Sequence, residues 1–60
     1  MAATPVYKFV ELSIVTDDLL EQTVNEWVAK GWALDAIRFV TNESSRRPVM
    51  AFVSFVRTAD

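Results

Sequence analysis

Three acidic side chains lie close together in the sequence, at Asp17, Asp18 and Glu21. Carboxylate oxygens grouped in this way could bind a hard cation such as Mg²⁺ or Ca²⁺. The same residues also suit the start of a helix, because acidic side chains favour its positive end, and Asp18 and Glu21 have the spacing of a capping box. Since helix capping explains them without an ion, we expect no metal site here.

The side chains that most often perform catalysis are missing. The chain contains no histidine and no cysteine, the commonest acids, bases and nucleophiles near neutral pH and the commonest zinc ligands. Ser44 and Ser45 therefore have no evident base to activate them and are interpreted as turn residues. A chain with one glycine also lacks the glycine-rich loops that hold nucleotide phosphates. We expect neither enzymatic activity nor a cofactor.

Arg38, Arg46 and Arg47 are the candidate contacts for an anion or a nucleic acid. Guanidinium groups bind phosphate through paired hydrogen bonds, and aromatic side chains on an open sheet could stack on bases. However, six basic and eight acidic residues give a net charge of -2, whereas nucleic-acid binding normally needs a clustered basic excess. Nucleic-acid binding is therefore the less favoured of two functional hypotheses.

Three segments rich in β-branched and aromatic residues are predicted to be strands. They are residues 6–15, 32–41 and 49–57. The third is apolar on both parities, which favours a central position in the sheet. A polar run that ends at Pro48 separates the last two strands and predicts a hairpin. We therefore expect a three-stranded antiparallel sheet in the order 2-3-1, with the order 1-2-3 as the alternative.

An amphipathic helix is predicted between the first two strands. Its apolar stripe consists of Leu20, Val24, Trp27 and Val28. Any of the three residues at 16–18 could cap its first turn. The single glycine, Gly31, is placed to end it in the left-handed conformation.

These elements define a single α+β domain over residues 1–60, with the element order β-α-β-β and one helix packed on the sheet. The crossover between the first two strands should be right-handed. Residues 1–4 and 58–60 are expected to be flexible. Residues 1–5 do not have the pattern of a signal peptide, and the apolar runs are far too short to span a membrane, so we expect a cytoplasmic protein.

The predicted sheet has more apolar side chains than one helix can cover. A helix of about 14 residues is roughly 21 Å long and covers one face, yet large apolar residues occur on both parities. The chain is short, is 52% hydrophobic and has no cysteine for disulfides. We therefore expect a homo-oligomer, a dimer or larger, in which sheet faces pack or edge strands pair. The expected interface residues are Tyr7, Phe9, Ile37, Phe39 and Phe52. Alternatively, bulges and strand ends wrap the core of a monomer.

Four segments resemble a known family. They are residues 7–10, 20–25, 31–34 and 51–55, and the most distinctive is the Gly-Trp-x-Leu step at 31–34. They are similar to segments of a bacterial family of proteins of about 60 residues that is defined only as a domain of unknown function. The resemblance implies the β-α-β-β order and a bacterial, cytosolic setting, and it supplies no catalytic residues. Family members often have a glycine-rich hairpin, whereas this chain has Glu-Ser-Ser-Arg-Arg at 43–47.

The two functional hypotheses predict a different dependence of binding on salt concentration. The first is a non-enzymatic binding or accessory protein that associates with itself, or with another protein, through its sheet. The second is a small nucleic-acid-binding regulator, whose affinity would fall steeply with salt because counterions are released on binding. We expect no retention on heparin or DNA at low ionic strength. Retention that disappears as salt is raised would favour the regulator.

Overall fold

The structure, a computed structural model, describes residues 4–44 and 46–59. Its elements are β1 (Thr4–Leu12), α1 (Asp17–Ala29), β2 (Ala33–Val40) and β3 (Met50–Ala59). β3 lies between β1 and β2 and is antiparallel to both. The predicted α+β fold and strand order are therefore confirmed. No helix in the described ranges has the length and apolar character needed to cross a membrane.

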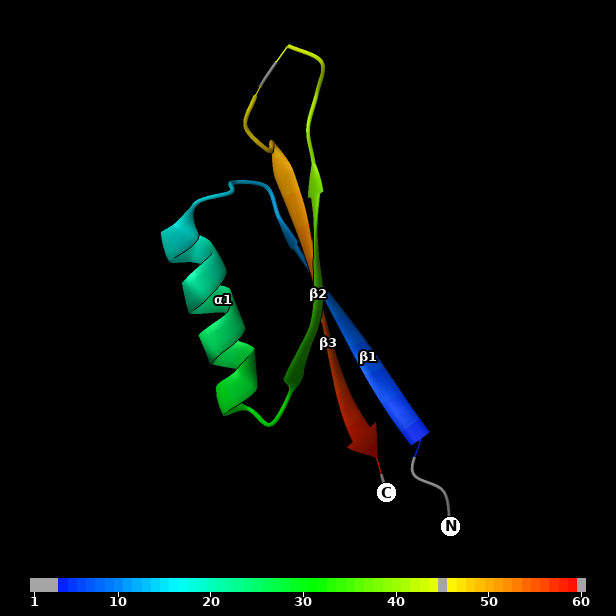
Figure 1. The fold of residues 1–60 in the computed structure, drawn as a ribbon. Helices are drawn as coiled ribbons and strands as arrows, with labels where there is room; N and C mark the ends of the chain where they lie inside the picture. The colour runs from blue at the N-terminus through cyan, green and yellow to red at the C-terminus, as the bar shows by residue number, and fades with distance from the viewer. Residues whose placement is uncertain (1–3, 45, 60) are drawn as a thin grey trace.

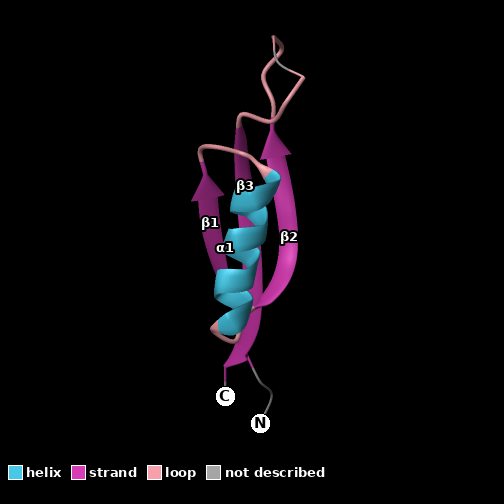
Figure 2. Ribbon diagram, turned by 90° about the vertical axis from the view of Figure 1, so that its left-hand side faces the viewer, coloured by secondary structure: helices cyan, strands magenta, loops and turns pink. Residues whose placement is uncertain are grey.

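The connection from β1 through α1 to β2 crosses over β3. Figure 1 shows α1 on one side of the sheet, with the β2–β3 hairpin extending beyond it. Seen from the helix side in Figure 2, α1 lies in front of β3, with β1 on the left and β2 on the right, both pointing upward. This is the right-handed crossover that the sequence predicts.

The first turn of α1 is capped by Thr16. Its backbone is extended, with φ -135° and ψ 158°, and its hydroxyl accepts a hydrogen bond from the Leu19 N–H at 3.1 Å. The helix already begins at Asp17, so Asp18 lies inside the first turn. The capping box predicted for Asp18 and Glu21 is therefore wrong, because neither residue stands at the cap position.

The last turn of α1 ends in a Schellman motif around Gly31, which has φ 98°. The Gly31 N–H donates to the Val28 carbonyl at 3.0 Å, and the Trp32 N–H donates to the Trp27 carbonyl at 3.1 Å. These two bonds satisfy carbonyl groups that have no partner within the helix. The predicted glycine cap is confirmed.

The strands differ from the predicted segments at their ends. β1 stops at Leu12, because residues 13–15 leave the sheet to reach the cap of α1. At the other end, β1 and β3 pair as far as Thr4 and Ala59. Residues 4, 58 and 59, which we expected to be flexible, therefore lie in strands whose ladder pairs their backbone groups. The remaining predicted ends, residues 1–3 and 60, lie outside the described residues.

The core lies between α1 and the middle of β3. Ala51, Val53 and Phe55, which are alternate residues of β3, are fully buried. The ring centroid of Phe55 lies 6.3 Å from that of Trp27 on α1. The alternate residues of β3 that include Phe55 therefore point toward the helix. The sequence pattern alone does not decide which of the two sets of alternate residues does so.

Lys8 interrupts the apolar parity of β1, and its contacts explain why it is tolerated. It pairs with Phe55 across the strands, which places its side chain on the helix side. The Lys8 ammonium group lies 4.3 Å from the centroid of the Trp27 ring, and that of Lys30 lies 4.4 Å from the same centroid. Each such cation–π contact contributes about 0.5–1 kcal/mol at an exposed site. Lys8 therefore links β1 to α1.

The substitution Gly31→Ala tests the helix cap. No atom lies within 4 Å of the position that the added Cβ would occupy, so the cost comes from the backbone alone. We expect the free energy of unfolding to fall by about 1 kcal/mol, measured by urea denaturation. Gly31→Asn should lose less, because asparagine adopts positive φ more readily than alanine. An alanine variant as stable as the unmodified chain would contradict the cap.

Candidate interaction surface

α1 packs against one face of the sheet, where Leu34 and Phe39 of β2 are still 44% and 50% exposed, and no other helix among the described residues covers the opposite face (Figure 1). Side chains of residues paired across antiparallel strands lie on the same face, so the register defines this uncovered surface, which we call the open face. Its members are Pro5, Tyr7, Phe9 and Glu11 of β1, Met50, Phe52, Ser54, Val56 and Thr58 of β3, and Ala33, Ala36, Arg38 and Val40 of β2.

Large aromatic side chains are exposed on the open face. The exposed fraction is 71% for Phe9, 53% for Tyr7 and 37% for Phe52. Phenylalanine is among the residues most often found inside proteins. A contiguous exposed apolar patch of this kind is typical of an interaction site.

Three rows of side chains cross the open face, with one residue from each strand in the order β1, β3, β2. From the hairpin end they are Glu11–Phe52–Arg38, Phe9–Ser54–Ala36 and Tyr7–Val56–Ala33. The two edges of the face therefore differ. The β1 edge carries two aromatic rings and a carboxylate, and the β2 edge carries two alanines and a guanidinium group.

A bulge in β2 supports the middle row. The register of β2 shifts between Leu34 and Ala36, which leaves Asp35 as the extra residue. The Ser54 hydroxyl donates to the Asp35 carboxylate at 3.0 Å and lies 3.2 Å from the Ala36 carbonyl. Ser54 is buried, and these contacts satisfy its polar group. The bulge also interrupts the regular hydrogen-bonding edge of β2, which disfavours pairing with a further strand.

Tyr7, Phe9 and Phe52, three of the five predicted interface residues, come together on the open face. Tyr7 and Phe9 are alternate residues of β1, and Phe52 lies in the row next to Phe9 on β3. The structure therefore brings together three of the four aromatic residues of the predicted surface.

Ile37 and Phe39, the other two predicted interface residues, lie on the helix side instead. They pair with two fully buried residues of β3, Val53 and Ala51. Placing them with Tyr7 and Phe9 is wrong because strict alternation along the second strand fails at the bulge. The bulge brings Leu34 and Ile37 to the same face.

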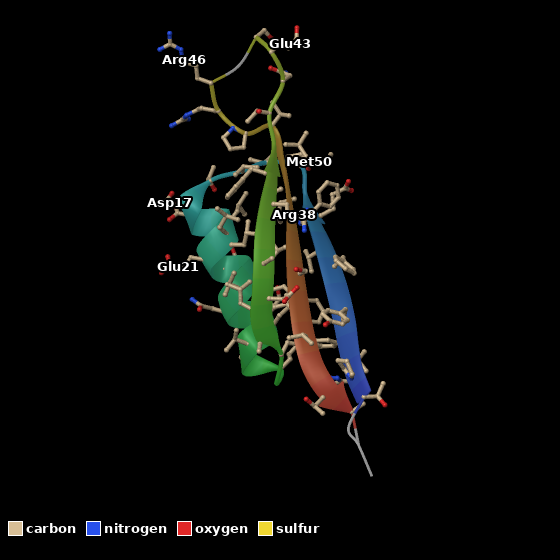
Figure 3. All side chains as sticks on the ribbon, turned by 45° about the vertical axis from the view of Figure 1, so that its right-hand side comes forward. Asp17, Glu21, Arg38, Glu43, Arg46 and Met50 are labelled. Atoms are coloured by element: carbon tan, nitrogen blue, oxygen red, sulfur yellow. The ribbon has the colours of Figure 1, made fainter. Side chains whose placement is uncertain are left out.

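The three arginines predicted to contact an anion do not form one patch. Arg38 lies on the open face in the same row as Glu11. Figure 3 shows Arg46 at the hairpin tip, away from Arg38 on the sheet. Arg47 lines a hollow of about 490 Å³ at the start of α1, together with Asp17. The structure therefore does not bring these arginines into one basic surface.

The hollows beside α1 do not gather the groups of a catalytic centre. A second hollow, of about 520 Å³, is lined by α1 residues alone: Asp17, Leu20, Glu21, Val24 and Asn25. Within residues 4–44 and 46–59, no three acidic side chains are grouped so that they could hold a metal ion. The open face is therefore the strongest candidate for a functional surface.

Comparison with known proteins does not assign this chain to a family. No protein-family model matches it, and no curated protein and no solved structure matches it. The likeness to a domain-of-unknown-function family remains a resemblance carried by four short segments.

Ser54→Ala tests the hydrogen bond beneath the open face. Asp35 loses its hydroxyl donor, so we expect the free energy of unfolding to fall by about 1 kcal/mol at a fixed protein concentration. Asp35→Ala should have a similar effect. The double variant should lose less than the sum of the two, because both substitutions remove the same bond. Fully additive losses in chemical denaturation would show that this bond contributes nothing.

Proposed function

We propose that this protein is a non-enzymatic binding or accessory protein that assembles with copies of itself through its sheet. The observation that carries the proposal is the exposed aromatic surface of the open face, formed by Tyr7, Phe9 and Phe52. Aromatic residues are enriched at protein interfaces, where their large area is removed from water. We infer that a second protein surface covers them in the assembled state.

The accessible surface supports this proposal. The chain, of 6.8 kDa, exposes 4767 Å². Folded monomers of this mass expose about 4,000 Å² according to the surface scaling of globular proteins. The excess, roughly 800 Å², is close to the area that each partner contributes to an interface of standard size. An assembly that covers one sheet face would remove this excess.

The shape of the chain supports it as well. The radius of gyration is 13.5 Å, and the extents along the principal axes are 50 × 20 × 12 Å. A compact chain of this length has a radius of gyration of about 10 Å. Among the described hydrophobic residues, only Ala51, Val53 and Phe55 are buried. So small a core gives little stability to a lone chain, and oligomerisation is one of the usual remedies.

We also propose that the protein is not an enzyme and that it is cytoplasmic. Without histidine or cysteine, the chain lacks the usual groups for acid–base and nucleophilic catalysis. Small secreted domains are usually stabilised by disulfides, which this chain cannot form, so we place it in the cytoplasm. The separation of Arg38 from Arg46 gives no support to the nucleic-acid-binding alternative.

Phe9→Glu tests assembly through the open face. We expect the unmodified chain to sediment as a dimer or larger oligomer at micromolar concentration, and the variant to sediment as a monomer. The reason is that an unpaired carboxylate is costly to bury in an apolar contact. Ile14→Glu is the matched control, because Ile14 is 64% exposed in the connection between β1 and α1, outside the sheet.

Circular dichroism of both variants distinguishes loss of assembly from loss of folding. If the chain folds only when assembled, Phe9→Glu unfolds while Ile14→Glu stays folded and associated, which still supports the proposal. An unmodified chain that remains a folded monomer at all concentrations would refute it. Equal effects of the two substitutions on association would show that the open face is not the contact.

A further inference from the structure

We propose that two copies pack open face against open face, around a two-fold axis parallel to β3, so that β1 of one copy lies opposite β2 of the other. This inference rests on the self-association proposed above and specifies its partner and its geometry. Two features of the open face lead to it: the charges at its edges and the sizes of its side chains.

A two-fold axis in this direction fixes which side chains meet. Rotation about a line along the central strand exchanges the two edges of the sheet, but it leaves each position along the strands unchanged. Every row of the open face therefore meets the same row of the partner. Residues of β3 meet their own copies, so Phe52 lies opposite the partner's Phe52. The two sheets cannot slide along the strands without losing the symmetry.

The charged row becomes complementary to itself in this arrangement. Glu11 and Arg38 both pair with Phe52, from opposite edges of the sheet. Neither has an ion-pair partner among the described residues. In the dimer, each Glu11 faces the partner's Arg38, and two equivalent ion pairs flank the two Phe52 rings. Packed sheets lie about 10 Å apart, a gap that these two long side chains can bridge together.

The other two rows are complementary in size. Phe9 and Tyr7, at the β1 edge, meet the partner's Ala36 and the partner's Ala33, at the β2 edge. Large side chains opposite small ones let two faces interdigitate at the density of a protein interior. Asp35 also lies near this surface, but its carboxylate already accepts the Ser54 hydroxyl, so it enters the contact with a hydrogen-bond partner.

Other modes of self-association fit the molecule less well. An axis across the strands would place β1 over the partner's β1 and would separate Glu11 from the partner's Arg38. Pairing of edge strands would leave the aromatic rings in water. Neither edge strand is regular enough to favour pairing with a further strand. Pro5 lacks an N–H group in β1, and the bulge at Asp35 interrupts β2.

Charge reversal at the two edges tests the arrangement. Glu11→Lys and Arg38→Glu, each made alone, place like charges opposite each other twice in every dimer. We expect each to raise the dissociation constant of the dimer by about ten-fold or more, measured by sedimentation. Mixing the two variants in equal amounts allows a heterodimer in which both contacts join opposite charges. The mixture should therefore associate about as tightly as the unmodified chain.

Two further variants complete the test. The double variant Glu11→Lys/Arg38→Glu exchanges the charges within one chain, so it should dimerise like the unmodified protein. Glu21→Lys, on the exposed side of α1, changes the net charge as Glu11→Lys does and should leave the dissociation constant unchanged. If the unmodified chain dimerises but neither mixing nor the double variant restores association, the two-fold arrangement is refuted while self-association is retained. If the unmodified chain is a monomer, both proposals fail.

Discussion

The contact between Phe55 and Trp27 joins the helix to the centre of the sheet, and the arrangement of both sheet faces depends on it. Phe55 lies on β3, the strand that is hydrogen-bonded to both of the others, and it is fully buried. Burying one such side chain contributes roughly 1.5–3 kcal/mol, a large part of the stability of a small domain. Because side chains alternate along a strand, committing Phe55 to the helix places Phe52 on the other face. Covering one face of this sheet therefore leaves an aromatic face uncovered.

At the edges of this small core, basic side chains instead of apolar ones pack over the tryptophan rings. The Trp27 ring has the ammonium groups of Lys8 and Lys30 over it, and the Arg57 guanidinium group lies 4.6 Å from the centroid of the Trp32 ring. Long basic side chains can cover an aromatic surface while their charged ends remain near water. This explains how a chain with few buried residues can hold one tryptophan on its helix and a second directly after it. No basic side chain among the described residues gives such cover to Phe9, which is mostly exposed on the open face.

The parts of the fold that depend on local pattern could be predicted from the sequence. Gly31 could be assigned to the helix end because few other residues adopt positive φ, and β3 could be placed centrally because it is apolar on both parities. The face of Ile37 could not be predicted, because it depends on the bulge at Asp35, which shifts the alternation of β2. The one available signal was an acidic residue within a strand segment, a residue type that strands disfavour. The role of Lys8 was also missed, because its contact with Trp27 joins elements that are distant in the chain.

The charged residues of the open face limit the ways in which two such faces could pack together. A uniformly apolar face could meet another in many registers, and with two exposed edges it would favour open-ended association. Glu11 and Arg38, one at each edge of a single row, penalise registers that bring like charges together or leave either charge unpaired. The aromatic rings would then supply most of the association energy, while the two charges would select a closed, symmetric pairing. In the proposed dimer, this division of roles would account for the two charged side chains that flank Phe52 on a surface with so much exposed apolar area.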